Sequence, residues 1–192
     1  MNSGRLAEWT QRQAGHGARS GTEPVPVFFG GAPNASSALV ESAHHVDPFL
    51  TDVRLYIYRQ MVTTSAAPSV EETARALSAP VGDVQAAYRA LAERHMIVLR
   101  PASDTVWMAM PFSNMQTAFT VISGGRAYYA PCAWDAFGVP AMLGADARIF
   151  TTCADCGGVL ERKVANGALS ETRGVVHFAL PARRWWDDVG FT

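Results

Sequence analysis

Residues 128–135 read Tyr-Tyr-Ala-Pro-Cys-Ala-Trp-Asp, and the rest of the chain is best interpreted outward from this stretch. It follows a run typical of a β-strand and opens a run typical of a helix, so Cys132 and Asp135 would share one helix face. Backbone N–H groups at a helix N-terminus favour a thiolate, which is a soft nucleophile and a soft-metal ligand. A neighbouring carboxylate can carry a proton or bind a ligand. The spacing alone leaves open a buried cysteine beside a capping aspartate.

The composition is that of a globular chain. Its 192 residues allow one to two domains, and 48% of them are hydrophobic. The formal net charge of −1 gives no electrostatic basis for tight nucleic-acid binding. Three cysteines form no disulfide framework and fit a reducing cytosol, so we expect a cytoplasmic protein. No apolar run of about 18 residues and no signal pattern is present, so we expect no membrane span.

The first 45 residues are rich in Gly, Ser, Ala and Pro, and we expect a flexible leader over 1–45. Within it, Val27-Phe28-Phe29 is the candidate for a short docking strand. His44-His45 is interpreted as an exposed loop or cap pair in preference to a metal site.

Residues 46–110 predict three helices followed by a hairpin. Asp47-Pro48 is a helix start with proline at the first helical position, and Ser69-Val70-Glu71-Glu72 resembles a capping box. A third helix is expected from Val81 to Met96, and strands at 97–99 and 106–110. This order is typical of a winged helix-turn-helix.

A winged helix raises the question of DNA binding. The basic side chains of its third helix are Arg89, Arg94 and His95, and they are offset by Asp83 and Glu93. A surface that follows phosphates is usually more basic. We therefore favour a structural role for this domain and expect no nucleic-acid partner.

Residues 111–192 predict a second domain with a mixed β-sheet and short helices, which makes the fold class α+β. A hairpin of strands 117–122 and 126–130 turns at Ser123-Gly124-Gly125 and delivers Cys132 to its helix. We expect this helix to be interrupted at Pro140 and to stop at Gly144. Further strands are expected at 147–152, 159–164 and 174–180.

A second chemical stretch reads Cys153-Ala154-Asp155-Cys156-Gly157 and resembles half of a zinc knuckle. A tetrahedral zinc site needs four ligands, and the sequence has no second CxxC. Cys132, His177 or His95 would complete such a site if folding brought them close. A bare thiol pair, or one buried cysteine plus one free cysteine, is the favoured interpretation.

The sequence around Cys132 resembles the core of the alkylmercury lyase (organomercurial lyase) family. The similarity is carried by Arg126 to Phe137, with Cys-Ala-Trp-Asp inside it, and by Val139-Pro140-Ala141-Met142-Leu143-Gly144. It continues through Ala147-Arg148-Ile149, Cys153 and Phe178-Ala179-Leu180-Pro181. It covers about residues 48–192 and is most specific between 126 and 157.

The resemblance implies protonolysis of a carbon–mercury bond, which releases a hydrocarbon and Hg(II) in mercury detoxification and resistance. It implies that Cys132 binds mercury and that Asp135 handles the proton and the metal. No cofactor is implied. The implied partners are an organomercurial substrate, small external thiols that remove the mercury ion, and mercuric reductase for product hand-off.

A second active-site cysteine follows the last core strand in that family, after Trp-Asp-Asp and Phe-Thr. The present sequence ends at Thr192 after the same residues, so the chain either stops one residue short of that cysteine or is truncated there. Within the chain, the candidates for the second thiol are Cys156 and Cys153, besides an external thiol. The resemblance matches Cys153 to a cysteine regarded as structural and leaves Cys156 as an addition.

Two other classes of function remain open from the sequence. One is a non-catalytic protein that binds a thiophilic metal through Cys132 with Cys153 or Cys156. The other is a winged-helix regulator that responds to such a metal.

Overall fold

The structure is a computed structural model that describes residues 47–178 and 180–190. The expected leader, with Val27-Phe28-Phe29 and His44-His45, lies outside the described residues, as do Ala179, Phe191 and Thr192. Residues 45–192 belong to one compact unit. The expected division of this unit into one domain over 46–110 and another over 111–192 is not tested and stays a prediction.

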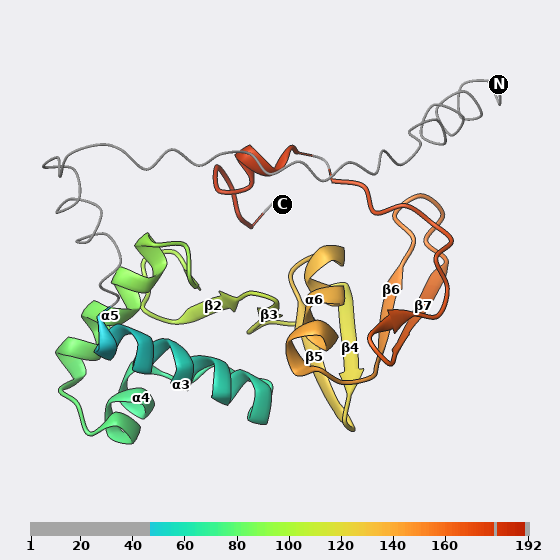
Figure 1. The fold of residues 1–192 in the computed structure, drawn as a ribbon. Coiled ribbons are helices and arrows are strands. Elements are labelled where there is room, and N and C mark those ends of the chain that lie inside the picture. Colours follow the sequence, from blue (N-terminus) through green and yellow to red (C-terminus); the bar gives the residue numbers. More distant parts are fainter. Residues whose placement is uncertain (1–46, 179, 191–192) are drawn as a thin grey trace, which may run out of the picture. The chain divides into compact units, whose positions relative to one another are not determined.

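Three helices open the described chain: α3 (Pro48–Thr64), α4 (Val70–Leu77) and α5 (Val81–Glu93) (Figure 1). The predicted starts are confirmed. The Asp47 carboxylate caps α3 by accepting from the Phe49 N–H at 2.9 Å. Ser69 and Glu72 form a capping box on α4, which satisfies two N–H groups that the helix itself leaves unpaired.

The hairpin of β1 (Val98–Leu99) and β2 (Val106–Ala109) follows the three helices in the predicted order, and the winged-helix assignment itself stays a prediction. Its turn is tied back to α5 through Asp104. This carboxylate accepts from Arg89 Nε at 2.8 Å and from Gln85 Nε2 at 2.6 Å. One basic side chain of α5, the helix that would contact DNA in a winged-helix reader, is therefore already paired within the protein.

All strands join one sheet in the order β1-β2-β3-β5-β4-β6-β7-β8. Their bounds are β1 (Val98–Leu99), β2 (Val106–Ala109), β3 (Phe112–Ser113), β4 (Phe119–Ser123), β5 (Arg126–Ala130), β6 (Ala147–Thr152), β7 (Val159–Ala165) and β8 (Ala168–Leu169). Every neighbouring pair is antiparallel, so the prediction of a mixed sheet was wrong. The predicted α+β class is confirmed in its coarse form. Short turns explain the pattern, because an antiparallel neighbour needs only a few connecting residues.

Helix α6 (Ala133–Leu143) packs on β4 and β5 (Figure 1). The row Tyr128–Val121–Ile149 crosses β5, β4 and β6, and all three side chains are buried. The two-residue turn Gly124-Gly125 has positive φ at both positions, which suits a type I′ hairpin. This tight turn fixes the register that brings β5 to the start of α6.

Three long-range hydrogen bonds join the helices to the sheet. Tyr128 donates its hydroxyl to the Val62 carbonyl at 2.9 Å, and Tyr58 donates to the Met110 carbonyl at 2.9 Å. The Asn114 side chain accepts from the Ala67 N–H at 2.9 Å. Helix α3 is thus held against the strands that carry the candidate site.

Two expected helix boundaries were wrong. Helix α5 ends at Glu93 and not at Met96, because His95 adopts a left-handed φ of 58° and the chain turns. Helix α6 continues through Pro140 to Leu143. Pro140 lies near the end of the helix, where it removes one backbone donor, and Gly144 then closes the helix by bonding to the Pro140 carbonyl.

The prediction of a strand at 174–180 was wrong, because none of the residues described there, 174–178 and 180, lies in a strand. Gly174 has a φ of 111°, and Val175 is 96% exposed. The last strand is instead β8, which pairs with β7. The strands expected at 147–152 and 159–164 correspond to β6 and β7.

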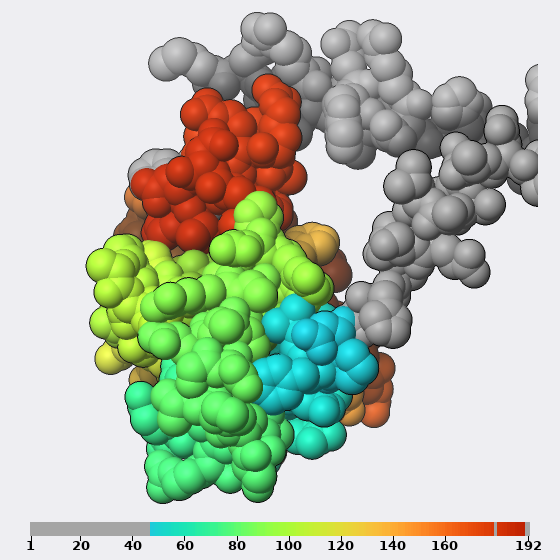
Figure 2. All heavy atoms as spheres, turned by 90° about the vertical axis from the view of Figure 1, so that its left-hand side faces the viewer, coloured from blue at the N-terminus to red at the C-terminus, as the bar shows by residue number. Residues whose placement is uncertain are grey.

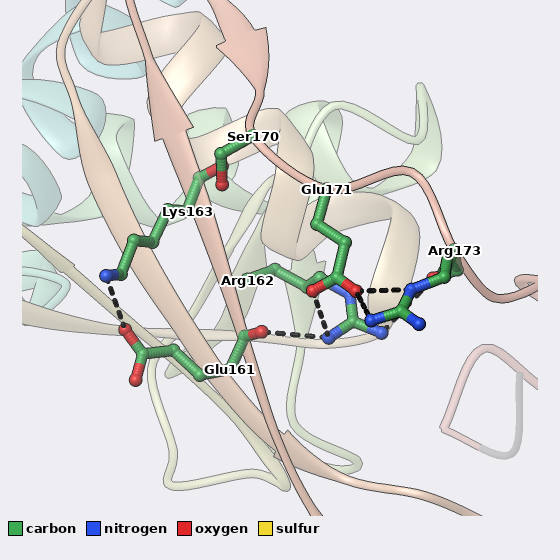
Figure 3. A network of polar contacts seen from close by, with 6 residues as sticks. All are labelled: Glu161, Arg162, Lys163, Ser170, Glu171 and Arg173. Atoms are coloured by element: carbon green, nitrogen blue, oxygen red, sulfur yellow. Dashed lines mark hydrogen bonds and ion pairs between the residues drawn. The ribbon is translucent and has the colours of Figure 1, made fainter.

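A surface network holds the chain as it leaves β8 (Figure 3). Arg162 donates to the Arg173 carbonyl at 3.2 Å, and Arg173 pairs with Glu171 at 2.7 Å. Ser170 donates to the Lys163 carbonyl at 3.1 Å. Such exposed ion pairs stabilise little, so their effect is to direct the chain along β7. Within the described ranges, no helix has the length and apolar character needed to cross a membrane.

The hydrogen bond from Tyr128 to the Val62 carbonyl should stabilise the contact between α3 and the sheet. Tyr128→Phe removes the hydrogen bond to the part-buried Val62 carbonyl and should lower the free energy of unfolding by about 1 kcal/mol. Urea denaturation measures this change. Tyr129→Phe is the matched control, since Tyr129 points to the other face of β5 and should change stability by less than about 0.5 kcal/mol. Equal effects in both variants would contradict the assignment.

Candidate functional site

Cys132 and Asp135 meet at the start of α6, as the sequence predicts. Cys132 is the N-cap residue, with extended backbone angles of φ −146° and ψ 178°. Its side chain does not cap the helix. It donates instead to Asp135 Oδ2, with the sulfur and oxygen 3.1 Å apart. Strand β5 and the first turn of α6 therefore fix a thiol and a carboxylate against each other.

The protonation of Cys132 differs from the expectation of a thiolate. The pKa of this thiol is raised to about 11, mainly by burial and also by the hydrogen bond to the Asp135 carboxylate and its negative charge. The backbone N–H groups of Asp135 and Trp134 lower the pKa, as the helix start predicts, but burial outweighs them. Cys132 thus keeps its proton at neutral pH and points it at Asp135.

The pKa of Asp135 is also raised. Burial raises the pKa of its carboxyl group, and the hydrogen bond from Cys132 partly offsets this rise. The Asp135 charge also acts on Tyr58 of α3. Burial raises the pKa of Tyr58, Arg54 lowers it, and the Asp135 charge adds a smaller rise. The Cys132 thiol and the Asp135 carboxylate are thus joined by one proton, which the thiol donates, in a partly buried site.

A cavity of about 250 Å³ opens beside this pair. Its walls are mainly apolar and aromatic, and two thioethers are among them. The lining residues are Met108, Met110, Pro131, Cys132, Trp134, Asp135, Phe178, Trp185, Trp186 and Val189. Sequence reasoning missed Met108, Met110 and Tyr58, because they lie on β2, just after it and on α3, and no motif links them to Cys132.

The residues after 177 form one wall of the cavity. Trp186 stacks on His95, with ring centroids 3.8 Å apart and planes 10° from parallel. Trp185 packs on Phe178 and donates its indole N–H to the Leu180 carbonyl at 3.0 Å. Figure 2 shows this red segment against the green residues near α5. Both tryptophans pack on other aromatic rings, and both line the cavity.

Gly190 fits this wall closely to β2. A Cβ atom at this position would lie 2.6 Å from Cη2 of Trp107, inside van der Waals contact. Only a residue without a side chain allows the tail to approach the indole ring this closely.

The candidate second thiols, Cys153 and Cys156, are absent from the residues that line the cavity. They lie in the turn between β6 and β7, where Cys153 is half-buried and Cys156 is exposed. The backbone N–H groups of Cys156 and Asp155, and then the Cys156 thiol, lower the pKa of Cys153. Over the described part of the chain, no three His, Cys, Asp or Glu side chains gather as metal ligands. The structure therefore does not bring Cys132, His177 or His95 to this turn as a zinc site.

The sheet nevertheless brings the two chemical stretches to the same end. Phe119 pairs with Ala130 of β5, and its neighbour Thr120 pairs with Phe150 of β6. Ala130 and Thr151 thus flank Phe119 in one row, and each precedes a cysteine by two residues. Two strand spacings separate the backbones of β5 and β6 there, which is about 10 Å.

The comparisons with known proteins point in one direction. Residues 112–192 match the sequence model of the family MerB, alkylmercury lyase. The fold is similar to a solved structure described as the mercury-bound form of MerB2, with a TM-score of 0.54 and 25% sequence identity. This similarity covers 70% of the present chain and 64% of that chain, which is less than two thirds of its length. Curated proteins give no match. The resemblance stated from the sequence is confirmed.

The raised pKa of Cys132 gives a test of the pair. In a chain with Cys153→Ser and Cys156→Ser, thiolate absorbance should rise with a midpoint near pH 11. Asp135→Asn removes the negative charge that disfavours the thiolate, so the midpoint should move to lower pH. An unchanged or higher midpoint in the Asn variant would show that Asp135 does not act on the thiol.

The contact of Gly190 with Trp107 gives a second test. Gly190→Ala should force the tail away from β2 and loosen the backbone around the already exposed Arg183 and Arg184, so initial trypsin cleavage there should be faster by about tenfold. Gly82→Ala is the matched control, because a Cβ at Gly82 meets nothing within 4 Å. Equal cleavage rates in both variants and the parent chain would place the tail elsewhere.

Proposed function

We propose that this chain, whose residues 112–192 match the alkylmercury lyase family, acts as an organomercurial lyase: it cleaves a carbon–mercury bond by protonolysis and releases a hydrocarbon and Hg(II). One observation carries the proposal. The Cys132 thiol donates to the Asp135 carboxylate at 3.1 Å, at the edge of an apolar cavity. This arrangement supplies a soft ligand for mercury and a proton beside it.

The first step replaces the thiol proton by mercury. The Cys132 sulfur attacks the mercury of an organomercurial that arrives bound to a small thiolate, and a sulfur–mercury bond forms. The small thiolate leaves, and the S–H proton passes along the existing hydrogen bond to the Asp135 carboxylate. Asp135 is the nearest acceptor for this proton, because the protonated Cys132 already donates its hydrogen bond to that carboxylate.

The second step delivers the proton to carbon. A further thiolate coordinates mercury and weakens the carbon–mercury bond. The carbon then leaves with the bonding electrons and takes the proton held by Asp135, so hydrocarbon departs and Hg(II) stays on two thiolates. The regenerated carboxylate is free to contact the ion. The further thiol stays a prediction among Cys156, Cys153 and an external small thiol that also removes the product.

The cavity suits the organic group of the substrate. Met108, Met110 and Phe178 offer an apolar surface, and a volume of about 250 Å³ accommodates a small alkyl or phenyl group. Exclusion of water strengthens the interaction between the proton and its acceptors. Mercuric reductase is the proposed recipient of the ion, and the proposed location is the cytoplasm.

Two alternatives predict different outcomes. A non-catalytic metal-binding protein would hold the organomercurial without releasing hydrocarbon. A metal-responsive regulator would bind DNA, which the ion pair of Arg89 with Asp104 disfavours because it occupies a basic side chain of the candidate reading helix.

The proposal predicts separable effects of two substitutions. Phenylmercury is mixed with the chain and excess small thiol in D₂O, and benzene is measured in the gas phase. Cys132→Ala should abolish tight one-to-one binding at this site. Asp135→Asn should keep binding and slow benzene release by about 10²- to 10⁴-fold, because an amide does not relay the proton.

Deuterium in the benzene provides the control for protonolysis. One deuterium per product molecule is expected, because the exchangeable S–H proton reaches the carbon. Binding without any benzene from the unmodified chain would favour the non-catalytic alternative. Full benzene release by the Asn variant would remove Asp135 from the mechanism.

A further inference from the structure

The turn between β6 and β7 holds two thiols in a closed loop. The last strand pair, Thr152 with Val159, sets its ends. Inside it, the Cys153 N–H donates to the Gly158 carbonyl at 2.8 Å, and the Gly157 N–H donates to the Cys153 carbonyl at 2.9 Å. Gly157 has a φ of 69°, which glycine adopts without steric cost. The backbone therefore fixes both cysteines relative to each other.

The two thiols lie close together, because Cys153 and Cys156 are three residues apart in a turn closed by the hydrogen bond from the Cys153 N–H to the Gly158 carbonyl. The pKa of Cys153 is lowered in part by the Cys156 side chain, which fits this placement. A Cβ at Gly158 would lie 3.4 Å from the Cys156 sulfur. The absence of a side chain at Gly158 leaves that sulfur open, and Cys156 is exposed to solvent.

The site offers two thiol ligands, and this number restricts which metal ions it can bind. No third His, Cys, Asp or Glu is gathered at these thiols in the part of the chain that the structure describes. Structural zinc takes four ligands, whereas soft ions are selected by thiolates. A paired thiol site without further ligands suits an ion that is satisfied by two sulfurs in a nearly linear arrangement.

We propose that the turn formed by Cys153 to Gly158 is a separate dithiol site that binds Hg(II) through Cys153 and Cys156. The two S–H groups each release a proton, two sulfur–mercury bonds form, and two small thiolates leave the ion and take up those protons. No electron is transferred. The choice of Hg(II) as the ligand rests on the proposed function, because that reaction releases this ion at the same end of the sheet.

Chelation makes such a site stronger than either thiol alone. Once one sulfur has bound, the second acts as an intramolecular ligand at high effective concentration. The site should therefore hold Hg(II) against an excess of a small monothiol. A single protein thiol would instead keep a small thiol as its partner ligand.

The test uses the full chain with Cys132→Ala, so that its outcome does not depend on lyase activity. Hg(II) is added with excess glutathione under reducing conditions, and native mass spectrometry gives the composition of the complex. We expect one mercury per chain, two protons lost and no glutathione attached. The matched chain with Cys132→Ala and Cys156→Ser should bind Hg(II) more weakly by about 10²-fold or more, and carry one glutathione per mercury.

Several results would overturn the dithiol site. They are equal retention of mercury by both chains, a glutathione adduct on the Cys132→Ala chain, and no mercury on that chain at all. Hydrocarbon release from the unmodified chain is measured separately. Failure there with a positive mass spectrum would reject the lyase proposal and leave the dithiol site in place.

Discussion

The hydrogen bond from the Cys132 thiol to the Asp135 carboxylate is the interaction on which the proposed chemistry depends. It joins two groups that are three residues apart, and its 3.1 Å length follows from the first turn of α6. Burial disfavours the charged form of each group, so the thiol keeps its proton to higher pH than a solvent-exposed thiol would. A soft metal that takes the place of this proton leaves it on the carboxylate, next to whatever the metal carries.

The sheet supplies the geometry that this bond requires. The Gly124-Gly125 turn sets the register of β4 and β5, and β5 ends directly before Cys132. The cavity around the pair is assembled from distant segments, since β2 contributes Met108 and the tail contributes Trp186. The stacking of Trp186 on His95 links this tail to the end of α5, so the helices also shape the site.

Local patterns in the sequence predicted the parts of the structure that are determined locally. Asp47, Ser69 and Gly144 predicted helix ends because capping depends on neighbours within a few residues. The pair Cys132 and Asp135 was predictable for the same reason. The antiparallel sheet and the thioether wall depend on contacts between remote residues, which no short motif encodes. The protonated state of Cys132 was missed because burial, a property of the whole fold, outweighs the helix start.

The central claim is that mercury replaces the Cys132 proton and that Asp135 receives it. Infrared difference spectra of the chain with Cys153→Ser and Cys156→Ser, recorded on adding phenylmercury without excess thiol, test this directly. The account predicts loss of the S–H stretch together with a new protonated-carboxyl band, and this band should be absent in the added Asp135→Asn variant. Loss of the S–H stretch with the proton released to the buffer, and with no carboxyl band, would contradict it.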